Sequence, residues 1–349
     1  MAKDLENEAR RRAVERIRQA KAHPPAEMED WANRIQSGDR VALAKAISLI
    51  ESHRPEDRNR SESLMTALPP AHGQALRYGF TGVPGVGKST WIEAAGMSLI
   101  KQGHSVAVLA VDPSSSRTGG SMLGDKTRMD GLAQHPSAFV RPSPTGETLG
   151  GVARATSESA RLCEAAGFDR ILIETVGVGQ SEIEVRRMTD VFVLLMLPGG
   201  GDGVQGIKRG ILEWADVVLM NKADGPKERV ELAKASLAAY RGALDLLPPP
   251  LDGEPPLFGT GSALDNKSVS QWVDRIEARL DAARTRGHLD ARRARQHADM
   301  LESMLNSEML HRMRSKPGFQ AAWKQLQSEV QHAQIQPFDA VRRLLDGLD

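Results

Sequence analysis

The sequence predicts an α/β fold in which a mostly parallel sheet has helices on both faces and helical extensions at both ends. Three observations lead to this prediction. Short apolar runs alternate with helical stretches through the middle of the chain, a glycine-rich loop directly follows the first run, and both ends carry apolar residues at helical spacing. Because several runs are apolar almost throughout, we expect strands that are covered on both faces, as in a parallel sheet.

Residues 1–60 are expected to form a helical N-terminal extension, in which Glu51–Arg60 is a charged link into the core. Four apolar residues carry its helical spacing: Leu43, Ala46, Ile47 and Ile50. Residues 61–284 are expected to form the α/β core. Its strands are predicted at seven runs: Leu76–Phe80, Ser105–Asp112, Ala138–Arg141, Arg170–Thr175, Val191–Leu197, Val217–Asn221 and Pro256–Gly259.

Residues 285–349 are expected to form a helical C-terminal arm. Two apolar stripes at helical spacing lie in it: Leu301, Met304, Leu305 and Met309, and then Val341, Leu344, Leu345 and Leu348. Such stripes need a cover, which either the core of the same chain or a second copy can supply.

The composition argues against several classes of protein. With 46 Lys and Arg against 45 Asp and Glu, the chain has no basic excess that would predict binding to nucleic acid or to an acidic membrane. Its one cysteine, Cys163, excludes an internal disulfide and a cysteine-based metal site. No apolar run approaches the ~20 residues that span a bilayer, and the charged start lacks a signal-peptide core. We therefore expect a soluble, cytoplasmic protein.

The glycine-rich loop, Gly82–Thr90, has the spacing Gly-x-x-x-x-Gly-Lys-Ser between a predicted strand and a predicted helix. Its glycines let backbone N–H groups surround phosphate oxygens, and the helix that follows adds its positive dipole end. Lys88 is expected to reach the β- and γ-phosphates and Ser89 to offer its hydroxyl to Mg²⁺. A chance glycine-rich turn is the alternative. The expected phosphate-binding residues are Gly85, Val86, Gly87, Lys88, Ser89 and Thr90.

Carboxylates follow two of the predicted strands. Asp112 ends the second run and Asp125 follows in a glycine-containing segment, so both are candidates for binding Mg²⁺ or its waters. For Asp112, a turn cap before Pro113 is the alternative. Glu174 ends the fourth run three residues before Gly177, a spacing by which nucleotide switches hold the magnesium shell and sense the γ-phosphate.

The nucleotide base is expected to bind at the motif Asn221-Lys222-Ala223-Asp224, which lies at the end of a predicted strand. A carboxylate at Asp224 can accept two parallel hydrogen bonds from the ring N–H and the amine of guanine, whereas adenine lacks that pair of donors. Lys222 is expected to lie along the base, and Asn221 either braces the loop or meets the base. Backbone N–H groups for the guanine oxygen are expected from Ser262, Ala263 and Leu264. The sequence therefore predicts GTP rather than ATP.

Two loops bear on hydrolysis and switching. Val178 occupies the position where many GTPases carry a glutamine that orients the attacking water, so we expect slow intrinsic hydrolysis that a partner accelerates. The glycine-rich loop of residues 198–210 includes Asp202, Gln205 and Lys208, polar groups that can pair differently in two states. It is predicted to be a further switch, with a flexible surface loop as the alternative.

With these motifs, the chain resembles the MeaB and MMAA family, once named ArgK: G-protein metallochaperones of adenosylcobalamin-dependent acyl-CoA mutases. The resemblance covers nearly the whole chain, and Glu174–Glu182 is highly specific. The matching core stretches are Gly82–Thr90, Val111–Gly120, Gly124–Met129, Glu174–Glu182, Pro198–Gly210 and Asn221–Gly225, with Gln36–Ser52 and Ala291–Leu348 outside the core.

The resemblance implies a P-loop GTPase of the SIMIBI-like class, with the C-terminal arm as its dimerisation arm. It also implies a mutase client, for which GTP gates the delivery of adenosylcobalamin and the removal of damaged cofactor. The metal-side and switch residues carry over as Ser89, Asp112, Asp125, Glu174 and Lys208. The chain departs from the family pattern at Ser116-Arg117 and Gly203-Val204, both in predicted switch segments, so these departures concern the client rather than the chemistry.

Two alternative functions share parts of this pattern. A GTPase that delivers nickel shares the fold type, but such proteins carry Cys and His clusters that this chain lacks at ligand spacing. A kinase or transport ATPase uses the same phosphate loop, but the guanine motif argues against it.

Overall fold

A computed structural model of the chain describes residues 25–52, 54–69, 73–112, 129–144, 149–175, 181–199, 209–244 and 254–347. The chain divides into two compact units, Met1–Ala282 and Ala283–Asp349. Within the described ranges, no helix combines the length and the apolar character needed to cross a membrane.

The first unit is built on a seven-stranded sheet with the order β3-β2-β4-β1-β5-β6-β7. Every neighbouring pair is parallel, which confirms the predicted α/β fold. The ends of the strands differ from the predicted runs by at most three residues. The strands are β1 Leu76–Gly82, β2 Val106–Asp112, β3 Ala138–Pro144, β4 Arg170–Thr175, β5 Val191–Met196, β6 Val217–Met220 and β7 Leu257–Thr260.

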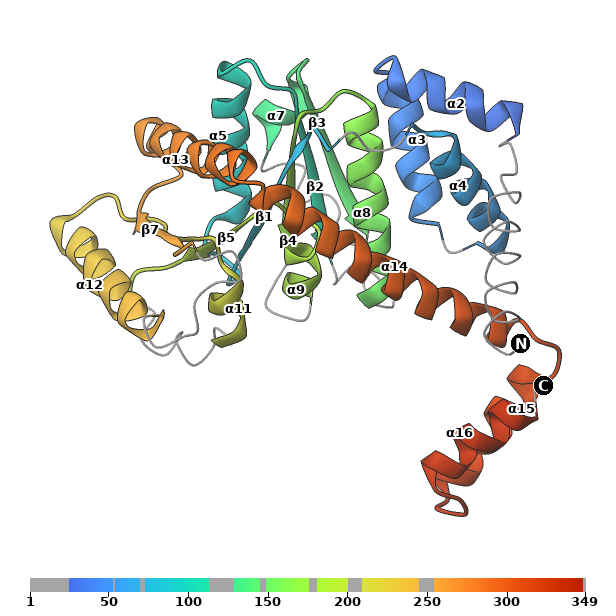
Figure 1. The fold of residues 1–349 in the computed structure, drawn as a ribbon. Helices are drawn as coiled ribbons and strands as arrows, with labels where there is room; N and C mark the ends of the chain where they lie inside the picture. Colours follow the sequence, from blue (N-terminus) through green and yellow to red (C-terminus); the bar gives the residue numbers. More distant parts are fainter. Residues whose placement is uncertain are drawn as a thin grey trace, which may run out of the picture. The chain divides into compact units, whose positions relative to one another are not determined.

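Helices cover both faces of this sheet (Figure 1). Helix α5 (Lys88–Lys101) packs on β1, β2 and β4 from one side, and α8 (Leu149–Ala165) packs on β2 and β4 from the other. Strand side chains alternate between the faces, so Ile171 and Ile173 join the apolar cluster that also contains Cys163 of α8. The other helices of this unit's sheet region are α7 Asp130–Gln134, α9 Ser181–Arg186, α11 Arg209–Trp214, α12 Lys227–Leu244 and α13 Asn266–Thr285.

The buried thiol of Cys163 provides a test of this packing. Burial raises the pKa of Cys163 to about 12. Because the thiolate is the reactive form, we expect the folded protein to resist iodoacetamide at about pH 8 and to react once it is unfolded in guanidinium chloride. Mass spectrometry of the intact chain measures this, with Cys163→Ala as the background control. Rapid alkylation of the folded chain would contradict the packing of α8.

The described part of the N-terminal extension consists of α2 (Ala26–Gln36), α3 (Arg40–Ile50) and α4 (Pro55–Ala67). Asp39 caps α3, because its side chain accepts hydrogen bonds from the first free amides of that helix. The prediction of a link over residues 51–60 was wrong. Proline at the first helical position and two acidic residues in the first turn favour a helix start there, so α4 occupies most of that stretch.

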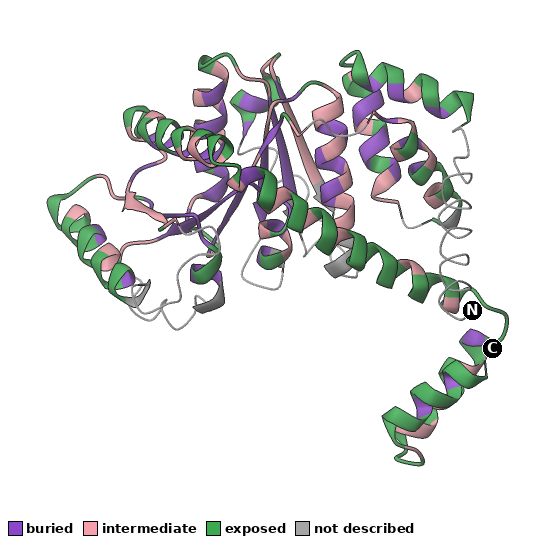
Figure 2. Ribbon diagram, viewed as in Figure 1, coloured by how far each residue is buried: buried purple, intermediate pink, exposed green. Residues whose placement is uncertain are grey.

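The second unit contains α14 (His288–Arg314), α15 (Phe319–Gln331) and α16 (Pro337–Asp346). Helix α16 packs on α15 and buries Leu344, while Val341 and Leu345 on the same helix are exposed. The predicted stripe on α14 is exposed along its length (Figure 2). Its members are Leu301 at 70%, Met304 at 41%, Leu305 at 55% and Met309 at 55% exposure. A surface of this kind is typical of an association site.

Candidate nucleotide-binding site

The glycine-rich loop connects β1 to α5 through positions that only glycine fits. Gly82 has φ +148°, and a Cβ there would lie 2.4 Å from the carbonyl oxygen of Leu195. Gly87 has φ +96°, and its Cβ would lie 2.9 Å from Nδ2 of Asn221. Both angles are ones that side-chain-bearing residues rarely adopt. The loop therefore keeps its backbone close to the neighbouring strand end and to the loop that follows β6.

Two side chains at the start of α5 are buried against this loop. Lys88 donates a hydrogen bond from Nζ to the carbonyl oxygen of Gly82 at 2.8 Å. Ser89 donates from Oγ to Oε1 of Glu174 at 2.9 Å, and Glu174 is only 4% exposed at the end of β4. The serine and the glutamate come from motifs that are 85 residues apart. They meet because β4 pairs directly with β1, where Phe80 lies opposite Glu174.

The Ser89–Glu174 pair suits a magnesium ion, because Mg²⁺ prefers hard oxygen donors and keeps several waters and phosphate oxygens as its other ligands. Within the described ranges, no group of three or more His, Cys, Asp and Glu side chains gathers in a way that would hold a metal. The magnesium prediction therefore depends also on two further carboxylates. For Asp112 only the backbone is described, at the end of β2, and Asp125 lies outside the described residues.

The loop after β6 is tied to the phosphate loop. Asn221 donates from Nδ2 to the carbonyl oxygen of Val86 at 2.8 Å, and Lys222 donates from Nζ to that of Gly85 at 2.8 Å. Lys222 has a positive φ of 57°, which turns the chain sharply at this point. Of the two roles predicted for Asn221, the structure shows the bracing of the loop. The phosphate motif and the base motif thus form one hydrogen-bonded unit.

The loop after β7 lies beside the base motif. The amide of Ala263 donates to Oδ1 of Asn221 at 3.2 Å, and the amide of Ala223 donates to the carbonyl oxygen of Gly261 at 3.1 Å. Ser262 is buried, and its Oγ accepts from the amide of Leu264 at 3.2 Å. These bonds hold residues 261–264 close to Asp224, a residue of intermediate burial. The two predicted base-binding segments are therefore neighbours.

Several predicted residues lie outside the described parts of the chain. They are Gly177 and Val178 after β4, and Lys208 in the loop of residues 198–210. Thr90 is described and is exposed on α5, one residue after Ser89. The roles assigned to these positions stay predictions.

Two residues of α13 that hold the loop after β7 were not predicted from the sequence. Ser268 accepts the amide of Ser262 at 3.3 Å on its Oγ, and Trp272 donates from Nε1 to the carbonyl oxygen of Thr260 at 3.1 Å. The sequence did contain a signal for Trp272, because this tryptophan follows Gly259 and Gly261, which lie on either side of the last residue of β7. Only the folded chain shows that the indole covers those glycines.

Comparisons with known proteins find a matching family model and relatives that include a probable GTPase. A family model described as methylmalonyl Co-A mutase-associated GTPase MeaB matches residues 43–318. A probable GTPase of Mycobacterium bovis is 48% identical over 329 residues, covering 94% of this chain and 97% of that protein. The mouse methylmalonic aciduria type A homolog, mitochondrial, is 49% identical over 223 residues, covering 61% of this chain and 53% of that protein.

One solved structure is similar along most of the chain. The crystal structure of an LAO/AO transport system kinase has a TM-score of 0.70 and 34% identity, and the match covers 92% of this chain and 97% of that one. This structural match covers both the sheet and the helices around it. The family match likewise spans most of the chain. The chain therefore belongs to the family of methylmalonyl Co-A mutase-associated GTPases named MeaB.

Proposed function

We propose that this protein binds and hydrolyses GTP, and that it acts as a chaperone for an adenosylcobalamin-dependent acyl-CoA mutase. The main support for GTP binding is that the phosphate loop and the base motif are joined by hydrogen bonds. Asn221 and Lys222 each donate to a carbonyl oxygen of the phosphate loop, at Val86 and Gly85. A nucleotide that lies along this unit meets phosphate-binding amides at one end and the Asp224 carboxylate at the other. Membership of the MeaB family supports the mutase part.

Each end of the site has a defined task in this proposal. Lys88 binds the β- and γ-phosphates by charge-assisted hydrogen bonds. Ser89 and Glu174, with Asp112 and Asp125, hold Mg²⁺, which when bound neutralises charge on the phosphate oxygens. Asp224 accepts the two donors of guanine. The amide of Ala263, which donates to Oδ1 of Asn221 in this structure, exchanges that acceptor for the guanine oxygen when the nucleotide binds. Since the carboxylate requires two parallel donors, this base site favours GTP and GDP over adenine nucleotides.

The client is expected to sense the triphosphate through the segments that carry Gly177 and Lys208. In this proposal, binding of GTP gates the loading of adenosylcobalamin, and hydrolysis is linked to protection or reactivation of the mutase. The exposed stripe of α14 supports a homodimer in which the C-terminal arm pairs with a second copy. No contact among the described residues favours the nickel-delivering alternative over this one.

Hydrolysis rates test the proposal. Because Val178 replaces the water-orienting glutamine, we expect the protein alone to hydrolyse GTP slowly and an acyl-CoA mutase to accelerate it by about tenfold or more, as partner-supplied groups do in related chemistry. Phosphate release should be measured with candidate mutases, namely methylmalonyl-, isobutyryl-, ethylmalonyl- and 2-hydroxyisobutyryl-CoA mutase, and with an unrelated CoA enzyme as control. Rapid hydrolysis by the protein alone would contradict the Val178 argument. A uniform lack of acceleration by all four mutases would contradict the client class.

A further inference from the structure

Helix α13 begins directly after the base loop, residues 261–265, and its first turns contact the backbone of that loop and of the residue before it. Asp265 caps the helix, because its side chain accepts the amide of Lys267 at 3.0 Å. One turn further on, Ser268 accepts the amide of Ser262 at 3.3 Å. Trp272 then donates to the carbonyl oxygen of Thr260 at 3.1 Å. The conformation of the base loop is therefore connected to the position of this helix.

The indole of Trp272 fits tightly against the backbone before the loop. A Cβ on Gly259 would lie 2.6 Å from Cζ2 of Trp272, and a Cβ on Gly261 would lie 3.1 Å from its Nε1. Trp272 is only 3% exposed, and the guanidinium of Arg275 lies over its ring, 4.1 Å from the centroid. This cation–π contact restrains the ring further. The glycines let the indole reach the backbone itself, so a shift of the ring would shift the base loop.

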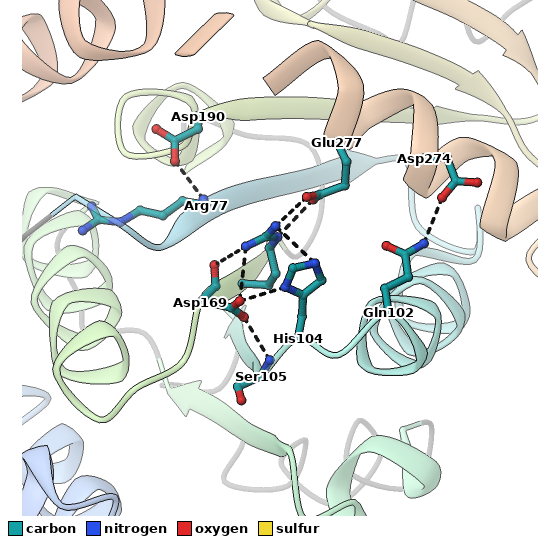
Figure 3. A network of polar contacts seen from close by, with 9 residues as sticks. Arg77, Gln102, His104, Ser105, Asp169, Asp190, Asp274 and Glu277 are labelled. Carbon is teal, nitrogen blue, oxygen red and sulfur yellow. Dashed lines mark hydrogen bonds and ion pairs between the residues drawn. The ribbon is translucent and has the colours of Figure 1, made fainter. Parts of the chain in front are cut away.

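The helix that carries Trp272 is itself anchored at the opposite end of the sheet. Figure 3 shows Gln102 bonded to Asp274 at 2.9 Å. The guanidinium of Arg170 makes two bonds to Glu277, at 3.1 and 2.6 Å. Arg170 also donates to the backbone carbonyl of Asp169 at 3.0 Å. A bidentate guanidinium–carboxylate pair that is largely shielded from water fixes geometry well. These anchors tie α13 to β4 and to the end of α5, so Trp272 is a fixed support for the base loop.

We propose that Trp272 and Ser268 are positioning residues for guanine recognition, which hold the amide of Ala263 where it donates to the oxygen of the base. This inference rests on the proposed function of the same site. In this proposal, neither Trp272 nor Ser268 contacts the nucleotide. In this structure the same amide donates to Oδ1 of Asn221, the residue that braces the phosphate loop, so the position of Ala263 sets the distance between the base oxygen and the phosphates. Loosening the loop should weaken recognition of that oxygen selectively.

The full-length chain with Trp272→Phe or Ser268→Ala tests this by equilibrium binding of three diphosphates. GDP has the guanine oxygen, IDP keeps the oxygen but lacks the amine, and 6-thio-GDP keeps both donors to Asp224 but carries sulfur, a weaker acceptor. We expect each variant to lose about three- to tenfold in affinity for GDP and for IDP, as for one weakened hydrogen bond. The loss for 6-thio-GDP should be clearly smaller, which is the signature of coupling to the base oxygen.

Trp31→Phe is a matched control, because Trp31 also donates its indole N–H to a backbone carbonyl, that of Ala42, at 3.0 Å within the N-terminal helices. It should bind all three nucleotides as the native chain does. An equal loss for the three nucleotides in both test variants would show general destabilisation and overturn the proposal, as would no loss in either. The proposed function has its own check, because native protein that binds ADP as tightly as GDP would refute the guanine site itself.

Discussion

Replacing Lys88 with alanine is expected to remove most of the GTPase activity. Lys88 is buried at the start of α5, and its Nζ already lies inside the phosphate loop, 2.8 Å from the carbonyl oxygen of Gly82. Removing a donor that stabilises charge in the transition state lowers kcat by about 10²- to 10³-fold in other enzymes. The lost charge-assisted bond should also weaken GTP binding by about 10- to 100-fold. Single-turnover hydrolysis and equilibrium binding of a fluorescent GTP analogue measure the two effects separately.

Lys101→Ala is the matched control for this experiment. Lys101 is the last residue of the same helix and is exposed, so its removal takes the same charge from α5 without touching the phosphate loop. It should leave binding and hydrolysis within about twofold of native, as for most surface substitutions. Circular dichroism establishes that both variants are folded. Native-like turnover by folded Lys88→Ala would refute the assignment of the phosphate site.

Replacing Asp224 with asparagine is expected to change which base the protein binds. The carboxylate accepts two donors from guanine, and an amide can accept only one while it presents a donor to the guanine amine. We expect GTP affinity to fall by about 100-fold, since two charge-assisted hydrogen bonds are disrupted. Xanthine carries a carbonyl in place of that amine, which the new amide can bond. Xanthosine triphosphate should therefore bind the variant more tightly than it binds the native protein, as competition against a fluorescent nucleotide can measure.

The variant Asp224→Ala distinguishes a gain of xanthine binding from a simple loss of guanine binding. Alanine removes the acceptor and provides no donor, so both guanine and xanthine nucleotides should bind weakly to it. If Asp224→Asn keeps its native preference for GTP over xanthosine triphosphate, the base-site assignment is wrong. The neighbouring backbone bond from Ala223 to Gly261 does not involve the substituted side chain, so both variants should fold normally.

The core of the fold was predictable because its signal is local. Buried parallel strands are apolar along their whole length, and the run Val191–Met196 is buried at every position. Residues 51–60 were harder to interpret, because α4 has only a weak apolar stripe and its polar sequence also suits a link. Its helical start depends on proline and acidic residues at the first turn, which are signals of a boundary rather than of a buried face.

The nucleotide motifs were also predictable, because each is a short stretch whose spacing reflects its chemistry. By itself the sequence determined the parallel α/β core, the phosphate loop, the guanine motif and the family resemblance. Only the tertiary structure decided that Asn221 and Lys222 bond to the phosphate loop, that Ser89 meets Glu174, and that Trp272 supports the base loop. The first three of these contacts join residues that are 85 to 137 positions apart in the chain, and Trp272 lies 12 residues after the carbonyl that it bonds. Their contacts depend on which strands are neighbours and on where α13 packs, and no local pattern of residues encodes that.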